Sequence, residues 1–277
     1  MNAMSAFRRY AATAALAGLM SLTACGPTPA SQPGAARSPG PAISTQAPPA
    51  TTPAPATTQA PATVTPAPSG TPKMPRQPVL RLDSRGSAVL TLQQRLAALH
   101  YFDVAKADGV FGQGTYHAVV AFQKVQGLTR DGIAGPATWA RLARPDVPAA
   151  RYRLATTSLE VNLAKQVIYY VSGGTIQRII DASTGSGAWY YSQGRQARAI
   201  TPAGRYRIYW RYPGGWQPGP LGSMYRPNYF HRGYALHGMT SVPAYPASHG
   251  CVRMTVPAMD RMWSSLRVGM PVAIYSS

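Results

Sequence analysis

Two stretches near the C-terminus decide how this chain is interpreted: Leu236-His237-Gly238 and, ten residues later, Ser248-His249-Gly250-Cys251-Val252-Arg253-Met254. A thiolate is the nucleophilic form of cysteine, so a cysteine that reacts near neutral pH needs an imidazole or another positive field nearby. Adjacent side chains on an extended segment diverge, so His237 from a separate strand is better placed than His249. We therefore predict that Cys251 is a nucleophile assisted by a histidine, with His237 favoured over His249.

Other residues of the second stretch fit the same chemistry. Gly250 lets the backbone approach a carbonyl closely, and amide N–H groups there are candidates to hold a developing oxyanion. Arg253 can bind a carboxylate through two parallel hydrogen bonds. The competing interpretation is that Cys251 is only a small, buried apolar residue.

Around these stretches the pattern is that of β-structure, from about residue 151 to the end. Alternating apolar residues predict strands, and Gly173-Gly174 predicts a hairpin turn between two of them. The alternating residues are Leu159, Val161 and Leu163, then Val167, Tyr169 and Val171, then Tyr206, Ile208 and Trp210, which alternate with Arg205, Arg207 and Arg211. Further strands are predicted through Tyr234 to His237 and through Val272 and Ile274, after a helix carrying Met259, Met262, Trp263 and Leu266.

Residues 79–143 show helical spacing instead. We predict a first helix capped by Ser87, a second starting at Thr115 and a third with Pro136 in its first turn. The residues expected in the shared core of these three helices are Val89, Leu92, Leu96, Leu99, Ala118, Val119, Phe122, Val125, Trp139 and Leu142. A near-repeat, Asp108-Gly109-Val110-Phe111-Gly112 and Asp131-Gly132-Ile133-Ala134-Gly135, predicts two similar turns that each lead into a helix.

The N-terminal quarter has a composition that does not fold into a core. Arg8 and Arg9 precede a short apolar run that is typical of a secretory signal and too short to span a bilayer. Its end, Leu22-Thr23-Ala24-Cys25, resembles the lipobox of bacterial lipoproteins, which implies lipid attachment at Cys25. An ordinary cleavable signal is the alternative. Residues 25–75 are rich in Pro, Ala and Thr and are predicted to be a disordered linker.

The charge balance limits the classes of partner. The chain has 27 basic and 8 acidic residues and a net charge of +19. It lacks a zinc-finger spacing or a basic block, so we predict no nucleic-acid partner; anionic wall polymers are a further candidate. The five histidines lack metalloprotease spacing, and we predict no metal and no cofactor.

The stretch from Ser248 to Arg253, together with Leu236-His237-Gly238, resembles the active-site motif of L,D-transpeptidases. Supporting matches are Ser183-Thr184-Gly185 and Thr201-Pro202-Ala203-Gly204, so the resemblance covers about residues 157–277. It implies a β-sandwich enzyme in which Cys251 forms a thioester with a peptidoglycan stem peptide, releases D-alanine and makes 3→3 cross-links. Gly238, Ser248, His249, Gly250 and Arg253 would support the pair formed by Cys251 and His237. Met239 stands where Thr or Ser often follows, which leaves donor and acceptor preference open.

Residues 79–143 resemble the peptidoglycan-binding domain of many wall enzymes, which implies a three-helix module that docks on peptidoglycan. A purely structural spacer is the alternative.

The sequence therefore predicts an exported, multidomain lipoprotein that faces the cell wall or periplasm. Its expected parts are a signal peptide (1–24), a linker (25–75), a small three-helix bundle (76–145) and a mainly β catalytic domain (151–277). Its expected partners are peptidoglycan stem peptides and glycan, and the membrane through the lipid anchor. Hydrolysis instead of transfer, protein anchoring at the same site, and a non-catalytic wall-binding lipoprotein remain alternatives.

Overall fold

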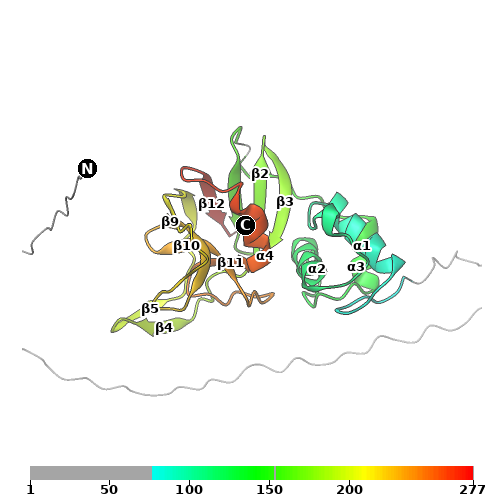
Figure 1. The fold of residues 1–277 in the computed structure, drawn as a ribbon, viewed down its shortest axis with the longest axis horizontal. Helices are drawn as coiled ribbons and strands as arrows, with labels where there is room; N and C mark the ends of the chain where they lie inside the picture. The colour runs from blue at the N-terminus through cyan, green and yellow to red at the C-terminus, as the bar shows by residue number, and fades with distance from the viewer. Residues whose placement is uncertain (1–76, 153, 277) are drawn as a thin grey trace, which may run out of the picture. The chain divides into compact units, whose positions relative to one another are not determined.

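The computed structural model describes residues 77–152 and 154–276 (Figure 1). The predicted signal peptide, the lipid-attachment residue Cys25 and the linker lie outside these residues. No helix in the described part of the chain is both long and apolar enough to cross a membrane.

The first described part is helical. It contains α1 (Ser87–Ala98), the short 3-10 helix η1 (Val104–Lys106), α2 (Gln113–Gln126) and α3 (Pro136–Ala143). The apolar face predicted from the sequence is confirmed for α1 and α2, because Val89, Leu92, Leu96 and Phe122 are fully buried in one cluster. Leu99 and Trp139 are only partly buried at the edge of this cluster.

Two of the predicted helix starts are wrong. Gly86, not Ser87, is the N-cap of α1, and no side chain caps that helix. Helix α2 begins at Gln113 with Gly112 as its N-cap, which places Thr115 inside the first turn. The Thr115 side chain is buried against the preceding loop instead of capping the helix end.

Each copy of the near-repeat is held by a buried glutamine. Gln93 Nε2 donates to the Asp108 carboxylate, the Val110 carbonyl and the Thr115 hydroxyl, while its Oε1 accepts from the Gly109 amide. Gln123 makes the matching set of bonds in the second copy, to Asp131, Gly132, Ile133 and Thr138. The two loops are therefore equivalent in their bonding as well as in sequence.

Within the described residues, the second part is built from two larger sheets and one hairpin. The first sheet has the order β3-β2-β1-β12-β6, with bounds β1 (Ser158–Asn162), β2 (Val167–Ser172), β3 (Thr175–Asp181), β6 (Gly204–Arg207) and β12 (Pro271–Tyr275). The second has the order β11-β10-β9-β7, with β8 also paired to β9; the bounds are β7 (Trp210–Arg211), β8 (Trp216–Gln217), β9 (Met224–His231), β10 (Tyr234–Met239) and β11 (Val252–Thr255). The hairpin joins β4 (Trp189–Ser192) to β5 (Arg195–Arg198).

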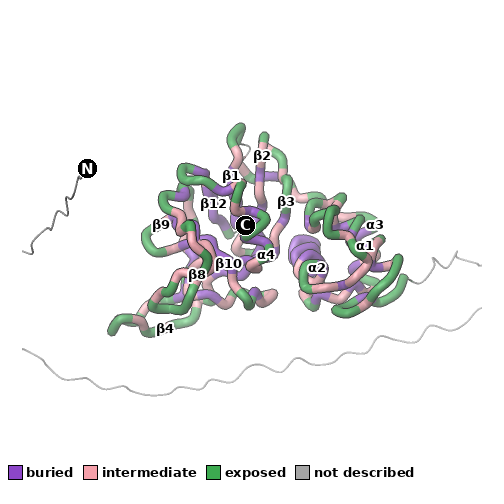
Figure 2. The backbone as a smooth tube through the Cα atoms, in the orientation of Figure 1, coloured by how far each residue is buried: buried purple, intermediate pink, exposed green. Residues whose placement is uncertain are grey.

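The two sheets and α4 (Val256–Trp263) contribute to one core (Figure 2). Its fully buried members include Leu159 and Val161 from the first sheet, and Leu236 and Val252 from the second. The predicted hairpin turn is confirmed: Gly173 and Gly174 have φ values of 57° and 74°, in the left-handed region that glycine reaches without strain. The predicted C-terminal helix and last strand are confirmed as α4 and β12.

The single strand predicted through Arg205 to Arg211 is wrong. The chain pairs with β12 as β6, leaves the first sheet, and joins β9 of the second sheet as β7. Ile208 is fully buried at this crossover, but Trp210 is 43% exposed. Alternating apolar residues predict which side chains share a face when the strand stays in one sheet. The pattern does not show that the chain passes from one sheet to another.

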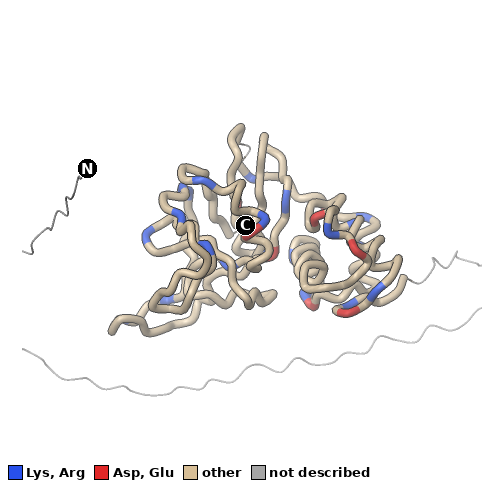
Figure 3. The backbone as a smooth tube through the Cα atoms, in the orientation of Figure 1, with Lys and Arg blue, Asp and Glu red and all other residues tan. Residues whose placement is uncertain are grey.

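Lys and Arg outnumber Asp and Glu along the β-rich part of the chain (Figure 3). Only three acidic residues follow Arg151 in the sequence, and two of them are buried. Glu160 accepts hydrogen bonds from the amides of Arg151 and Tyr152, and Asp181 is only 4% exposed. Because their charges are satisfied internally, these two carboxylates do little to offset the surface arginines.

Candidate active site

The candidate base lies on β10, and the candidate nucleophile directly precedes the neighbouring parallel strand β11. In the register of β10 and β11, Leu236 is opposite Val252 and His237 is opposite Arg253. Leu236 and Val252 are buried in the core, so alternation directs His237 and Arg253 to the other face. Cys251 directly precedes β11, two positions before Arg253. His237 is 3% exposed and Cys251 is half-buried.

The tautomer of His237 follows from one hydrogen bond. Nδ1 lies 2.9 Å from the Gly238 carbonyl oxygen, which can only accept, so Nδ1 carries the proton and Nε2 keeps its lone pair. Burial lowers the pKa of His237 from 6.5 to about 4, an effect that the Gly238 bond opposes and the Arg253 charge reinforces. His237 is therefore neutral near neutral pH.

The surroundings of Cys251 disfavour the thiolate form expected from the sequence. Burial raises the pKa of Cys251, although the Ala235 amide and the Arg253 charge lower it in part. Sγ donates to the Gly233 carbonyl oxygen at 3.9 Å. The neutral imidazole of His237 supplies no positive charge that would stabilise a thiolate in the resting state. The arrangement fits proton removal during attack and does not fit a permanent thiolate–imidazolium pair.

Ser248 fixes the loop that carries Cys251. Its hydroxyl donates to the Cys251 carbonyl oxygen at 2.6 Å and accepts from the Gly250 amide at 3.0 Å. Because the Gly250 amide already has this partner, it is not a free donor for an oxyanion. The suggestion that N–H groups at Gly250 hold the oxyanion is therefore wrong for that amide.

Gly250 occupies a position that only glycine fits. Its φ is 135°, and an added Cβ would lie 2.5 Å from the Tyr234 ring and 2.8 Å from the Ile200 carbonyl oxygen. Its own carbonyl accepts from the Thr201 hydroxyl at 2.7 Å, and the same hydroxyl accepts from the Gly185 amide. The Thr201-Pro202-Ala203-Gly204 and Ser183-Thr184-Gly185 motifs thus meet at the loop of Cys251.

Gly250→Ala is expected to destabilise the fold and to displace Cys251. We expect a loss of about 1–3 kcal/mol in the free energy of unfolding from backbone strain alone, with more from the clash at Ile200. Denaturant unfolding measures this loss. Gly269→Ala is the matched control, because Gly269 has a φ of 87° but open space around its Cβ position. Equal losses in the two variants would contradict the role given to the close contacts.

The other predicted supporting residues have separate surroundings. His249 packs edge-on against Tyr190 of β4, with ring centroids 4.8 Å apart, so it faces the hairpin. Gly238 lies under Tyr225 and Met259, where a Cβ would come within 3.0 Å and 3.2 Å of their atoms. Among the described residues, the Nε atom of Arg253 is buried without a hydrogen-bond partner.

Sequence reasoning missed Tyr190, Tyr229 and Tyr234 near the site. Burial is the main cause that raises the pKa of Tyr229 and Tyr234, and the nearby Cys251 adds to it in both. Aromatic residues at alternate strand positions are normally assigned to packing, so the sequence offered no signal for them. Within the part of the chain that the structure describes, no three His, Cys, Asp or Glu side chains gather closely enough to hold a metal ion.

Comparison with known protein families gives two matches. Residues 85–142 match a putative peptidoglycan binding domain, and residues 156–274 match the L,D-transpeptidase catalytic domain. Among solved structures, the chain is similar to an L,D-transpeptidase from Xylanimonas cellulosilytica, with 44% identity and a TM-score of 0.68. That similarity covers 74% of this chain and 100% of the Xylanimonas chain.

Similarity to curated proteins is more local. The chain is 35% identical over 109 residues to a spore cortex-lytic enzyme of Oceanobacillus iheyensis, covering 39% of this chain and 37% of that protein. It is 43% identical over 74 residues to a probable N-acetylmuramoyl-L-alanine amidase of Bacillus licheniformis, covering 26% of this chain and 21% of that protein. The chain thus spans well under two thirds of the length of these relatives.

Proposed function

The chain belongs to the L,D-transpeptidase family, and we propose that it cross-links peptidoglycan stem peptides through a thioester at Cys251. The observation that carries this proposal is that Cys251 directly precedes β11, whose register sets His237 of the neighbouring strand β10 opposite Arg253. The identity of the base is supported by the His237 tautomer, because its Nδ1–H is occupied by Gly238 and its Nε2 can accept a proton.

In the first half-reaction, Sγ of Cys251 attacks the carbonyl that joins the third stem residue, a diamino acid, to the terminal D-alanine. Nε2 of His237 takes the thiol proton as the C–S bond forms. The C–N bond then breaks, and D-alanine leaves with that proton on its amine. The enzyme is left as a thioester with a neutral imidazole.

In the second half-reaction, the side-chain amine of a neighbouring stem attacks the thioester. A C–N bond forms and the C–S bond breaks, and the amine proton passes through His237 to the sulfur. The product is a 3→3 cross-link and the thiol is restored. Ser248 and Gly250 hold the loop, and Arg253 is the candidate for a substrate carboxylate.

Muropeptide analysis after incubation of the purified protein with tetrapeptide-bearing peptidoglycan tests the reaction. We expect 3→3 dimers together with free D-alanine, and neither product from Cys251→Ala. Tripeptides without dimers would contradict transfer and identify water as the acceptor.

The remaining parts of the chain complete the proposal. Residues 76–145 form a small three-helix bundle that binds peptidoglycan, and residues 151–277 form a sandwich-like catalytic domain. The family match to a peptidoglycan binding domain at residues 85–142 supports the first assignment. Acting on peptidoglycan places the protein outside the cytoplasm.

A lipid anchor at Cys25 would tether the protein through the linker 25–75. The support is the sequence Leu22-Thr23-Ala24-Cys25. Metabolic labelling with a fatty acid is expected to mark the wild type and not Cys25→Ser. Equal labelling of both proteins would exclude this anchor.

A further inference from the structure

Lys124 of α2 is a charged residue with a fully buried side chain. Burial of an ammonium group is unfavourable unless all of its donors are satisfied. Lys124 Nζ donates to Asp181 Oδ1 at 2.5 Å, to the Ala182 carbonyl at 2.8 Å and to the Gln166 carbonyl at 3.2 Å. All three acceptors belong to the β-rich part, so the helical part inserts this charge into the catalytic part.

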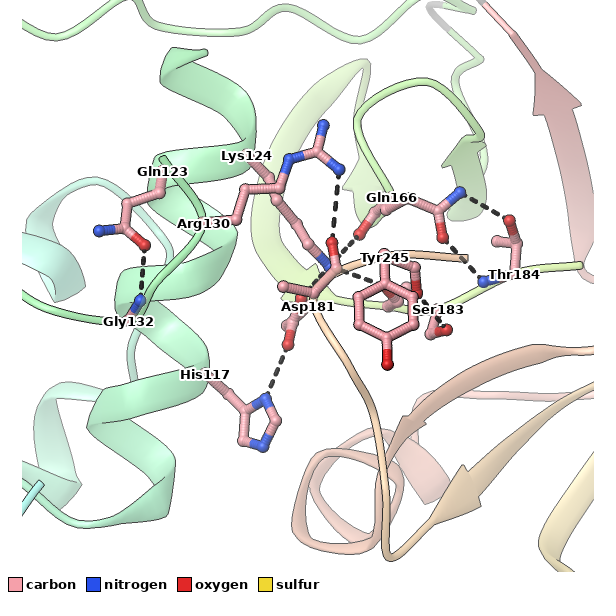
Figure 4. Close-up of polar contacts among 12 residues, drawn as sticks. His117, Gln123, Lys124, Arg130, Gly132, Gln166, Asp181, Ser183, Thr184 and Tyr245 are labelled. Atoms are coloured by element: carbon pink, nitrogen blue, oxygen red, sulfur yellow. Dashed lines mark hydrogen bonds and ion pairs between the residues drawn. The ribbon is translucent and has the colours of Figure 1, made fainter. Parts of the chain in front are cut away.

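Asp181, at the end of β3, is held from the same helix by a second residue. Its Oδ2 lies 2.7 Å from His117 Nδ1, while Oδ1 accepts from Lys124 (Figure 4). Burial lowers the pKa of Lys124, and the Asp181 charge opposes that effect. Removing one partner of such a pair leaves an uncompensated buried charge, so the two residues depend on each other.

Gln166 carries the connection from Lys124 toward the active site. Its carbonyl accepts from Lys124 and from the Ala182 amide, and its φ of 59° is unusual for a residue other than glycine. Its side-chain amide donates to the Thr184 hydroxyl at 2.6 Å, and its Oε1 accepts from the Thr184 amide at 2.8 Å. Gln166 therefore fixes the position of Thr184.

Ser183 and Thr184 hold the loop of Cys251 on both sides of that residue. The Thr184 carbonyl accepts from the amides of Ala247 and Ser248, each at 2.9 Å. Ser183 exchanges two backbone hydrogen bonds with Arg253, at 3.1 Å and 2.9 Å. The Ser183-Thr184 segment, which Lys124 holds through Gln166, therefore makes the hydrogen bonds that position the loop of Cys251.

We propose that Lys124 is a positioning residue for the active site, acting through Gln166 and the Ser183-Thr184 segment on the loop that carries Cys251. The helical part then contributes to the catalytic architecture in addition to binding the wall. This inference rests on the proposed function only for its effect on turnover. Its effect on the loop is measurable in the absence of any reaction.

Lys124→Met in the full-length protein is the primary test, with Lys165→Met as the matched control. Lys165 also bridges the two parts, because its Nζ donates to the Val125 carbonyl at 3.0 Å, but that bond does not reach the Ser183-Thr184 segment. We expect hydrogen exchange of the Ala247 and Ser248 amides to accelerate at least about tenfold in Lys124→Met, because their acceptor is no longer fixed. We expect exchange in Lys165→Met to match the wild type.

Turnover is measured on the same proteins. Displacement of a reacting group by about 1 Å is expected to lower kcat by about 10- to 100-fold in Lys124→Met, with retention on peptidoglycan sacculi unchanged. If the wild type shows no transpeptidation while exchange responds as described, the proposed function fails and the positioning role stands. Wild-type exchange in a folded Lys124→Met protein would overturn the positioning role alone.

A double variant separates positioning from simple destabilisation. Lys124→Met with Asp181→Asn removes both buried charges, so its Tm is expected to recover much of the loss seen in Lys124→Met. The hydrogen bonds to Gln166 and Ala182 stay absent, so kcat is expected to remain low and exchange fast. Recovery of kcat and exchange together with Tm would show that Lys124 acts only on stability, which would overturn the proposal.

Discussion

Replacing Cys251 with alanine is expected to abolish turnover, with a loss of at least about 10³-fold in kcat. The reason is that alanine lacks the sulfur atom of the proposed thioester, so the proposed reaction loses its intermediate. Tripeptide and dimer formation from purified stem peptides provide the measurement. The substitution removes one half-buried sulfur atom at a loop and is expected to leave the fold and retention on sacculi intact.

Intact mass measurement gives an independent test of the same residue. A carbapenem is expected to add covalently to the wild-type protein and not to Cys251→Ala, since the family resemblance implies acylation of this thiol. Cys25→Ser serves as the control, because it removes the other cysteine of the chain. An adduct that persists in Cys251→Ala, or a wild-type protein that stays unmodified, would contradict an active site at Cys251.

Replacing His237 with glutamine is expected to lower kcat/KM by about 10²- to 10⁴-fold, the usual contribution of a positioned base. Glutamine fills much of the space of the imidazole and can donate to the Gly238 carbonyl, but it does not accept a proton at neutral pH. Initial rates across a pH series measure the effect. The wild type is expected to keep its activity down to about pH 5 and to lose it near the pKa of His237, about 4. An unchanged acid limb in His237→Gln would identify a different base.

The free energy of unfolding is expected to depend on pH through the same lowered pKa of His237. Below pH 6.5 the unfolded chain protonates this imidazole, whereas the folded chain resists protonation until about pH 4. The unfolded state thus binds more protons in this window, so stability is lost as pH falls through it, by up to about 3 kcal/mol. His237→Gln is expected to lack this share of the loss, so its free energy of unfolding falls less than that of the wild type when denaturant unfolding is compared near neutral pH and near pH 4.

Patterns with a local physical cause predicted much of this fold. Gly173-Gly174 marked a hairpin because the turn requires positive φ. The spacing of Met259 and Met262 marked α4 because both are buried on it, although the helix ends at Trp263, before Leu266. The motif at Cys251 predicted the reaction class, and the register of β10 and β11 sets His237 opposite Arg253, two positions after Cys251. The catalytic roles of both residues stay predictions until the variants are measured.

The rest depended on contacts that a pattern does not contain. Lys124 lies in a helix where a lysine usually marks a solvated face, and its acceptors come from residues more than 40 positions away. The change of sheet at Ile208 and the partner of the Gly250 amide are likewise set by tertiary packing. Burial also raises the pKa of Cys251 and lowers the pKa of His237. A neutral imidazole supplies no positive field, so the sequence alone did not predict that the thiolate is disfavoured.

The ion pair between α2 and β3 has a consequence for protein engineering. The proline-flanked segment near residue 147 invites a cut, after which either half would be fused to a foreign partner. Such a chimera would bring a lysine without its aspartate, or an aspartate without its lysine, into a closed interface. A graft therefore has to keep Lys124 and Asp181 together, or replace both residues.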